Sequence, residues 1–355
     1  MDLRDDLVSL AAAHAATIGV TDLAPFPEVG DEMRARIDAG STSKLGFTYK
    51  DVGVAAAPLL SFPWGRSIVV VAVGYLHDGD GPRDGRSVAR FADGDRYHTL
   101  TTILGELAEH LDRSGYRVEI VFDDDRLVDR AVAARAGVGW SGKSSMLLVP
   151  GHGPWVLLGS IVTDALLPRD EAMLRTCGTC DDCIPACPTA AIVAPGVIDA
   201  RRCLAAIFQS RGDIPREVRT AAGGRIYGCD DCLTSCPPGA RDLESRSVEP
   251  DAFTALDLLG MSDRELAASV AHWYVPGRRM RFLRRNALVA LGNTGSETAV
   301  PVILGYLGHP DAMLRRHAAW SLGVLAPDLV GSIRDRLVAT EQDDGVRREL
   351  DAACA

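Results

Sequence analysis

The feature that most limits how this chain can fold is a run of cysteines near its middle, which holds eight of its nine cysteines. The run begins with Cys177-x2-Cys180-x2-Cys183-x3-Cys187 and continues into Pro188. This is the spacing of bacterial ferredoxins, in which three close thiolates hold one [4Fe–4S] cluster and the cysteine before the proline ligates a different cluster. One motif therefore predicts two clusters in the same region.

A second group of cysteines supplies the remaining ligands. It reads Cys229-x2-Cys232-x3-Cys236 and lacks a first neighbouring cysteine, and Cys203 is the one spare cysteine in the region. The crossed ligand pattern of two-cluster ferredoxins then predicts two complete sets of four. The first set is Cys177, Cys180, Cys183 and Cys236, and the second set is Cys187, Cys203, Cys229 and Cys232.

Structural zinc is the alternative for these cysteines, because paired CxxC motifs also bind zinc. Zinc sites seldom need a third cysteine at the same spacing or a Cys-Pro step after it, so the pattern favours iron–sulfur clusters. Disulfides are rare in the cytosol, and the chain shows no secretory signal. The ninth cysteine, Cys354, lies near the end of the chain and is expected to be a free thiol.

Length and charge limit the class of protein. A chain of 355 residues is expected to form two or three compact units. Its formal net charge of −10 repels phosphate at long range, so any RNA contact requires a local basic patch. The most apolar stretches, such as 67–75 and 154–162, are too short to cross a bilayer. We therefore expect a soluble, cytoplasmic protein without a membrane partner.

The segment before the cysteines alternates between strand-like and helix-like patterns. Runs rich in β-branched residues at 67–73 and 116–122 predict strands, and a third strand is predicted at 146–149. Apolar spacing predicts helices at 99–114 and 127–136, each of which stops at a glycine. These patterns predict an α/β domain.

Three carboxylates, Asp123 to Asp125, follow the second predicted strand. Open α/β sheets commonly bind ligands at the carboxyl ends of their strands, so these residues are candidates for a site. Adjacent carboxylates raise one another's pKa values, which would keep one of them protonated. The alternative is a solvated run of charge.

The end of the chain contains a repeat. Leu283-Arg-Arg-Asn-Ala followed by Gly292 recurs 31 residues later as Leu314-Arg-Arg-His-Ala followed by Gly323, and a weaker copy begins near Val346. This period predicts pairs of short helices stacked like HEAT repeats. The predicted organisation is an α/β domain at 1–165, a ferredoxin-like double-cluster domain at 166–245 and α-helical HEAT-like repeats at 246–355.

Two clusters in series conduct single electrons, and they need an acceptor. A simple electron carrier would not need the long α/β segment in front of its cysteines, so the chain is expected to be an enzyme. No GxGxxG motif opens a βαβ unit, so a nicotinamide site is not indicated.

Several motifs together resemble those of the epoxyqueuosine reductases, which are cobalamin-dependent enzymes of tRNA modification. After the ferredoxin run these motifs are RRC at 201–203 and RIYGCDDC at 225–232. Before it they are ARFADGDRYH at 89–98 and AGVGWSGK at 136–143. The HEAT-like end also matches, so the likeness covers nearly the whole chain.

The resemblance implies a base-off cobalamin in the N-terminal domain beside one cluster. It implies reduction of epoxyqueuosine to queuosine at the wobble position of tRNA, with electrons from an external donor such as a flavodoxin or ferredoxin. The family's proton donor is an aspartate at the end of the strand before the helix that leads into AGxGWxGK, and Asp123 matches it.

The resemblance also implies a set of cofactor contacts. The expected residues are Tyr97, His98, Asp123, Gly142, Lys143, Ser144, Ser210, Asp230 and Asp231. Simpler roles stay open: Tyr97 and His98 suit the packing and capping of a helix start, and Lys143 suits a glycine-rich surface turn. GVGWSGKS formally matches the phosphate-binding Walker pattern, but it is predicted to join a helix to a strand, which argues against nucleotide hydrolysis.

Paired arginines recur at one position of the repeat. Placed on one face of the stack, they would form a basic stripe for the phosphates of tRNA. The residues concerned are Arg281, Arg284, Arg285, Arg315 and Arg316. Ordinary salt bridges to acidic neighbours are the alternative.

Two other functions stay open at this point. One is a related cobalamin and iron–sulfur reductase that acts on another epoxide or an organohalide. The other is an electron-transfer module without catalytic activity.

Overall fold

The computed structural model describes residues 3–43, 45, 49–83, 86–250, 254–295 and 297–353, so the predicted free thiol of Cys354 lies outside the described residues. The chain divides into two compact units. The first comprises Met1–Pro82, Gly94–Arg201 and Asp231–Glu249, and the second comprises Arg83–Asp93, Arg202–Asp230 and Pro250–Ala355. The predicted middle domain, 166–245, is thus shared between the two units, and its boundaries stay predictions.

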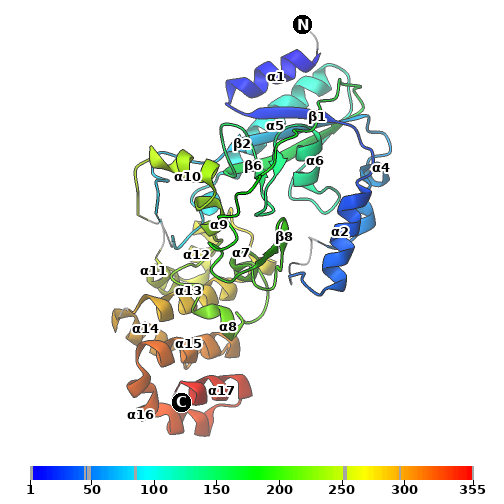
Figure 1. The fold of residues 1–355 in the computed structure, drawn as a ribbon. Helices are drawn as coiled ribbons and strands as arrows, with labels where there is room; N and C mark the ends of the chain where they lie inside the picture. Colours follow the sequence, from blue (N-terminus) through cyan, green and yellow to red (C-terminus); the bar gives the residue numbers. More distant parts are fainter. Residues whose placement is uncertain are drawn as a thin grey trace. The chain divides into compact units, whose positions relative to one another are not determined.

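The first unit is built on a four-stranded sheet with the order β1-β2-β6-β3 (Figure 1). Its strands are β1 (Thr17–Thr21), β2 (Ser67–Gly74), β3 (Val118–Val121) and β6 (Val156–Thr163). All adjacent strands are antiparallel. The prediction of an α/β domain is confirmed, and the strand order and directions come from the structure alone.

Helices cover both faces of this sheet. Ile68, Val70 and Ala72 of β2 join the core beside α6 (Asp129–Arg135), while a Cβ at Gly159 of β6 would meet the Leu104 side chain of α5 (Tyr97–Arg113) at 2.6 Å. Because alternate residues of a strand face opposite sides, α5 and α6 lie on opposite faces. Both helices were predicted within two residues of their bounds.

The antiparallel order brings the carboxyl ends of β2 and β3 to one edge of the sheet, because both strands run against β6. Gly74 at the end of β2 pairs with Val156, and Val121 at the end of β3 pairs with Ser160. Asp123 therefore follows a strand at this edge, as predicted.

Short elements complete the first unit. They are α1 (Leu3–Ala13), α2 (Pro27–Asp38), α3 (Val52–Ala55), α4 (Pro58–Ser61), β4 (Trp140–Ser141), β5 (Leu147–Leu148), β7 (Ile192–Ala194), β8 (Val197–Ile198), α9 (Asp231–Thr234) and α10 (Pro237–Glu244). Trp155 is buried, and its indole Nε1 donates to the carbonyl of Gly239 at 2.9 Å. This bond fastens α10 to the segment that enters β6.

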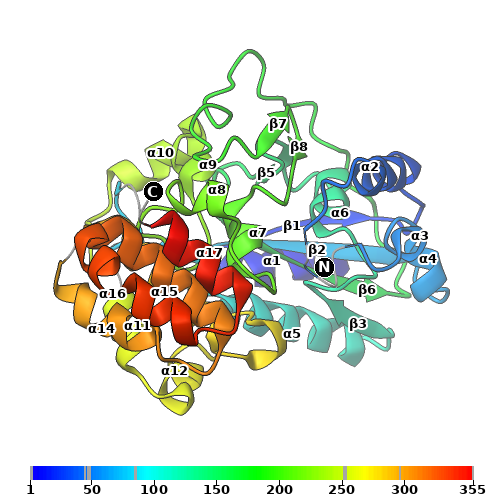
Figure 2. The same cartoon turned by 90° about the horizontal axis from the view of Figure 1, so that it is seen from below.

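The second unit contains the predicted helix pairs, which lie side by side in Figures 1 and 2. Its α-helices are α7 (Leu204–Phe208), α8 (Arg216–Arg219), α11 (Ala255–Gly260), α12 (Asp263–Ser269), α13 (Arg281–Thr294), α14 (Val300–Tyr306), α15 (Ala312–Leu325), α16 (Pro327–Thr340) and α17 (Asp344–Ala352). Single 3₁₀ turns form at Arg90–Ala92, Pro276–Arg278 and Glu297–Ala299. The repeated Leu-Arg-Arg segments lie in α13 and α15, so the repeat prediction is confirmed.

Within the described part of the chain, we find no helix with both the length and the apolar character needed to cross a membrane.

Candidate active site

The loop between β3 and α6 carries the predicted acid. Asp123 has a φ of 47°, in the left-handed region that residues other than glycine seldom adopt, although aspartate tolerates it better than most. Its side chain is exposed, and it makes no hydrogen bond or ion pair within the described residues. Backbone strain of this kind is concentrated at functional sites.

The two neighbouring carboxylates are neutralised by cations. Asp124 accepts several hydrogen bonds from Arg126, among them one from Nε at 2.9 Å and one from Nη2 at 2.7 Å, and Lys50 lies 2.9 Å from Asp125. The hydrogen bond from Arg126 holds the pKa of Asp124 below its usual value. The expectation that the three carboxylates raise one another's pKa is therefore wrong for Asp124, and Asp123 is the acid of this trio that is left without an ion pair in the described structure.

Tyr97 lies next to this loop. It is the first residue of α5, and its ring centroid is 6.3 Å from that of Phe122, the residue before Asp123. His98 is exposed, and its backbone N–H donates to Asp95 at 3.2 Å, as in a helix cap. Tyr97 is thus brought to the edge of the sheet that holds Asp123.

The glycine-rich motif forms a β-hairpin rather than a phosphate loop. β4 and β5 pair around a turn in which Gly142 N–H donates to Met146 at 2.8 Å. The chain enters the hairpin from α6 through Gly137, whose φ is 69° and where a Cβ would meet the Glu171 carbonyl at 2.4 Å. A phosphate loop would have to join a strand to a helix, so the argument against nucleotide hydrolysis is confirmed.

This hairpin turn contacts the first cysteine loop. Lys143 Nζ donates to the carbonyl of Gly178 at 3.0 Å, and Gly178 lies between the first two cysteines of the ferredoxin run. Arg130 of α6 donates to the carbonyl of Ser145 at 2.6 Å, and Ser144 is buried. The hairpin turn, which holds the predicted cofactor residues, is therefore hydrogen-bonded both to α6, the helix after the Asp123 loop, and to the first cysteine loop.

All four cysteines of the first predicted ligand set belong to the first unit, and the set stays a prediction. Cys236 precedes α10, and burial raises the pKa of its thiol, with further increases from the charges of Cys177, Cys183 and Cys180. A donor set of four thiols fits a [4Fe–4S] cluster.

The second predicted ligand set is divided between the units. Cys187 and Cys232 belong to the first unit, and Cys203 and Cys229 belong to the second. The Sγ of Cys187 accepts a hydrogen bond from the backbone N–H of Ala191 at 3.2 Å, which is a common way to stabilise a thiolate. This ligand set stays a prediction.

The other predicted cofactor contacts have different surroundings. Ser210 and Asp230 are buried in the second unit, and Asp231 begins α9 in the first. Ser210 Oγ donates to the Ala206 carbonyl at 2.6 Å, and Asp230 accepts from the backbone N–H of Arg90 at 2.8 Å. Burial raises the pKa of Asp230. Both Ser210 and Asp230 therefore have structural partners within their own unit.

The repeat arginines point largely inward, which corrects the predicted basic stripe. Arg284 donates to the Leu258 and Met261 carbonyls near the end of α11, and Arg285 is fully buried and donates to the Ile207 and Phe208 carbonyls at the end of α7. Carbonyls at a helix end lack partners within the helix, so these arginines cap helices. Burial lowers the pKa of Arg285 to about 9.

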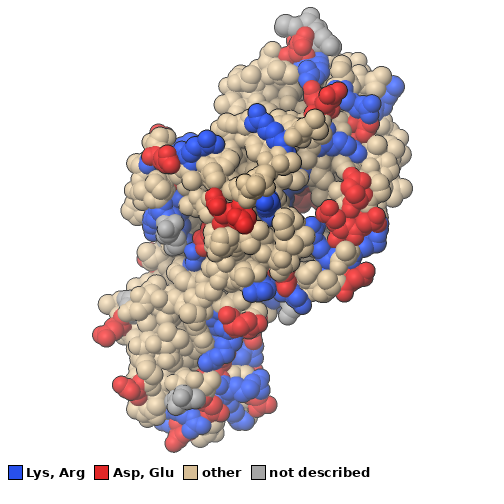
Figure 3. Space-filling view, in the orientation of Figure 1, with Lys and Arg blue, Asp and Glu red and all other residues tan. Residues whose placement is uncertain are grey.

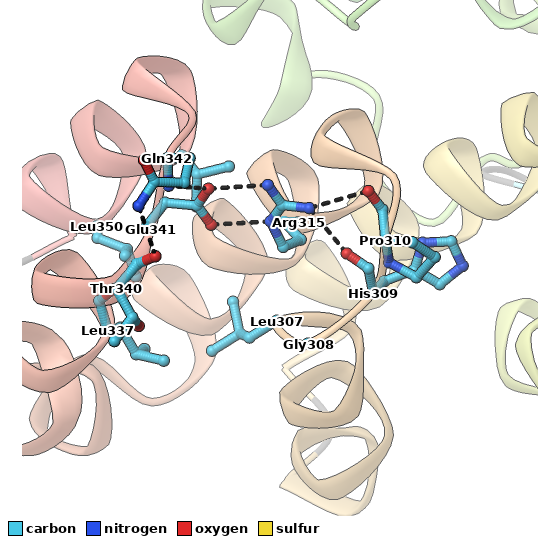
Figure 4. A pocket seen from close by; sticks show the side chains of 11 residues that line it. Leu307, Gly308, His309, Pro310, Arg315, Leu337, Thr340, Glu341, Gln342 and Leu350 are labelled. Atoms are coloured by element: carbon cyan, nitrogen blue, oxygen red, sulfur yellow. Dashed lines mark hydrogen bonds and ion pairs between the residues drawn. The ribbon is translucent and has the colours of Figure 1, made fainter.

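The remaining repeat arginines are ion-paired. Arg281 lies 2.8 Å from Asp311, and Arg316 lies 3.1 Å from Asp343. Arg315 forms two hydrogen bonds with Glu341 beside a pocket of about 330 Å³ (Figure 4). Figure 3 shows the same mixture of blue and red side chains over the repeats. The alternative of salt bridging is thus the better account of the Leu-Arg-Arg positions.

We predict that Arg285→Met lowers the free energy of unfolding by about 3–5 kcal/mol, the range for breaking a buried charged network. Arg348→Met is the matched control, because Arg348 is exposed at the equivalent position of the third repeat copy. It should change stability by about 0.5 kcal/mol or less. Chemical denaturation of both variants gives these values. Unchanged stability of Arg285→Met together with weaker binding to tRNA would instead favour the RNA-contact hypothesis.

Comparison with known proteins shows the domains and the family of this chain. Residues 176–239 match the family model of the 4Fe-4S double cluster binding domain, and residues 282–353 match that of HEAT repeats. Epoxyqueuosine reductase of Bacillus cereus is 31% identical over 98% of this chain and 96% of its own length.

Two solved structures are similar over almost their whole length. An epoxyqueuosine reductase with an epoxyqueuosine-modified tRNA-Tyr stem loop is 30% identical, with a TM-score of 0.88 and coverage of 99% of this chain and 98% of that one. A Bacillus subtilis epoxyqueuosine reductase, described with its catalytic aspartate loop swung out of the active site, is 28% identical, with a TM-score of 0.86 and the same coverage. This chain belongs to the epoxyqueuosine reductase family of oxidoreductases.

Proposed function

We propose that this protein reduces epoxyqueuosine in tRNA to queuosine, with electrons delivered through two [4Fe–4S] clusters to a bound cobalamin. The observation that carries the proposal is the placement of Asp123. Its carboxylate is free of ion pairs in the described structure, while the nearby hairpin turn is tied through Lys143 to the first cysteine loop. Asp123 and the cysteines proposed to hold the first cluster therefore belong to one compact unit.

The chemistry matches these parts. Removing an epoxide oxygen as water breaks two C–O bonds, forms a C=C bond, and consumes two electrons and two protons. Each [4Fe–4S] cluster passes one electron at a time, so two clusters suit a two-electron reduction. Cobalamin, when bound, supplies a reducible cobalt centre that transfers these electrons to carbon.

Residues of the hairpin are suited to hold that cofactor. Trp140 Nε1 is buried and has no hydrogen-bond partner within the described residues, so it is a donor available to a ligand's carbonyl. Gly142, Lys143 and Ser144 follow it in the turn and were expected to be cofactor contacts. A buried donor without a partner beside a glycine-rich turn fits a bound group rich in amides.

Asp123 is proposed as the proton donor to the departing oxygen. Its left-handed backbone holds the carboxyl out of the ion pairs that fix Asp124 and Asp125. The Bacillus subtilis relative is described with an aspartate's catalytic loop swung out of the active site, which supports a loop carboxylate in this role. Tyr97, which packs beside Phe122, is proposed to orient the substrate or the cofactor.

The tRNA substrate is supported by the relative bound to a modified stem loop. We further propose a cytoplasmic location and an external one-electron donor such as a flavodoxin or ferredoxin, because the clusters need reduction between turnovers. The eight cysteines named above are proposed as the cluster ligands.

We predict eight iron atoms per chain after anaerobic reconstitution, because the cysteines form two sets of four. Iron analysis tests this number, and a value near four, or zinc instead of iron, would contradict it. Cys203→Ala should remove one of two EPR signals and leave the signal of the cluster held by Cys177, Cys180, Cys183 and Cys236.

Asp123→Asn should keep both clusters and cobalamin but slow turnover by about a hundredfold or more, the usual scale for loss of a general acid. Asp125→Asn is the matched control, since that carboxylate is paired with Lys50 and should cost little. Single-turnover assays on an epoxyqueuosine-containing anticodon stem loop measure both rates. Full activity of Asp123→Asn would place the acid elsewhere.

A further inference from the structure

The proposed reaction consumes two protons per turnover, and one carboxylic acid carries one. A second proton must therefore reach the site before the oxygen leaves as water. Asp124 is a poor source, because the hydrogen bonds from Arg126 hold its pKa below the usual value, and Asp125 is ion-paired with Lys50.

Another carboxyl lies beyond this trio. Asp129 is the first residue of α6, one short loop after Asp123. Its Oδ1 atom is buried and accepts no hydrogen bond from any described residue. A charged carboxylate with one oxygen buried and unpartnered is costly, whereas a protonated carboxyl in the same place is far less so.

The charges that act on Asp129 support the neutral form. Burial is the main cause that raises its pKa to about 7, and the negative charge of Asp123 adds to it, as does that of Asp124 to a smaller extent. The neighbouring Arg130 acts in the opposite direction, but its guanidinium is directed to the Ser145 carbonyl of the hairpin turn. Asp129 thus responds to the charge state of Asp123.

We propose that Asp129 is the store of the second proton and delivers it to Asp123. The inference rests on the proposed function. In the first step Asp123 gives its proton to the epoxide oxygen as one C–O bond breaks, and it becomes negative. Asp129 then passes its own proton to Asp123, which gives it to the same oxygen as the second C–O bond breaks and water departs.

In this scheme the clusters supply the two electrons, and Asp129 regains a proton from solvent after turnover. Asp129 does not touch the substrate and acts only through Asp123, so we call it a positioning residue. If its role were only structural, Asp129 would have to be neutral, but its replacement would not change the pH dependence of the turnover rate.

The protonated state is tested without substrate. Infrared difference spectra of the full protein between pH 5.5 and 8.5 should contain a protonated carboxyl band that titrates near pH 7 and is absent from Asp129→Asn. Because the pKa of Asp129 is raised on folding, native stability falls as pH rises toward 7 and levels off above it. The melting temperature of Asp129→Asn should therefore exceed the native value by an amount that grows from pH 5.5 to 7.

The proton transfer is tested in single turnovers on the modified stem loop. The single-turnover rate of the native protein should fall as pH rises above 7. Asp129→Asn should lose this limb, which is the fall in rate above pH 7. At pH 6.5 the variant should react at least tenfold more slowly than the native protein, with unchanged iron and cobalamin. Asp125→Asn is the control and should keep both the rate and the limb. Added imidazolium should partly restore Asp129→Asn, because a small acid can replace the missing proton store.

Three outcomes would overturn the proposal. They are the absence of the titrating band, a native rate in Asp129→Asn, and a slow rate that keeps the native pH limb. No product from the native protein would instead refute the proposed function, and the infrared and melting results would still decide whether Asp129 is protonated.

Discussion

The hydrogen bond from Trp155 to the Gly239 carbonyl is the contact on which the site most depends. It fastens α10 to the segment that enters β6, and α10 begins directly after Cys236. Cys236 comes about fifty residues after Cys187, the last cysteine of the ferredoxin run, yet both segments belong to the first unit. The proposed ligand set of Cys177, Cys180, Cys183 and Cys236 therefore depends on how this segment packs as well as on the local motif.

The distribution of charge around the β3–α6 loop gives the site its chemistry. Five carboxylates lie between residues 119 and 129, and the structure separates them by their partners. Glu119, Asp124 and Asp125 are ion-paired. Asp123 stays exposed in a left-handed backbone, and Asp129 has a buried, unpartnered oxygen. One stretch of acidic residues therefore contains carboxyl groups in different electrostatic environments, because burial and nearby cations act on each one differently.

Much of the fold was predictable from local patterns, because helix spacing and cysteine spacing are short-range signals. The helices α5 and α6, the strand β2 and the repeat pairs all follow their patterns. The central strand β6 was seen only as an apolar stretch, since it is buried on both faces and lacks the alternation that marks a half-exposed strand. The antiparallel order was missed because strand pairing is set by contacts between distant residues.

Candidate site residues could be proposed from the sequence where they lie in a recognisable motif. They could not be proposed where a residue's surroundings depend on contacts with residues far away in the sequence. The cysteine run was recognised from its spacing, and Asp123 was proposed from its place after a predicted strand and from the family resemblance. Asp125 pairs with Lys50, which is far from it in the sequence, and the buried position of Arg285 depends on its hydrogen bonds to α7. Neither contact can be recognised from the neighbouring residues in the sequence. Asp129 resembles an ordinary acidic residue at a helix start, and only the burial of its oxygen distinguishes it.

The central claim is that this chain removes the epoxide oxygen of a tRNA nucleoside. Its most direct test is nucleoside mass spectrometry of tRNA from a bacterium that lacks its own epoxyqueuosine reductase and expresses this protein. We expect epoxyqueuosine to disappear and queuosine to take its place. Persistence of epoxyqueuosine, while the purified protein carries both clusters and cobalamin, would contradict it.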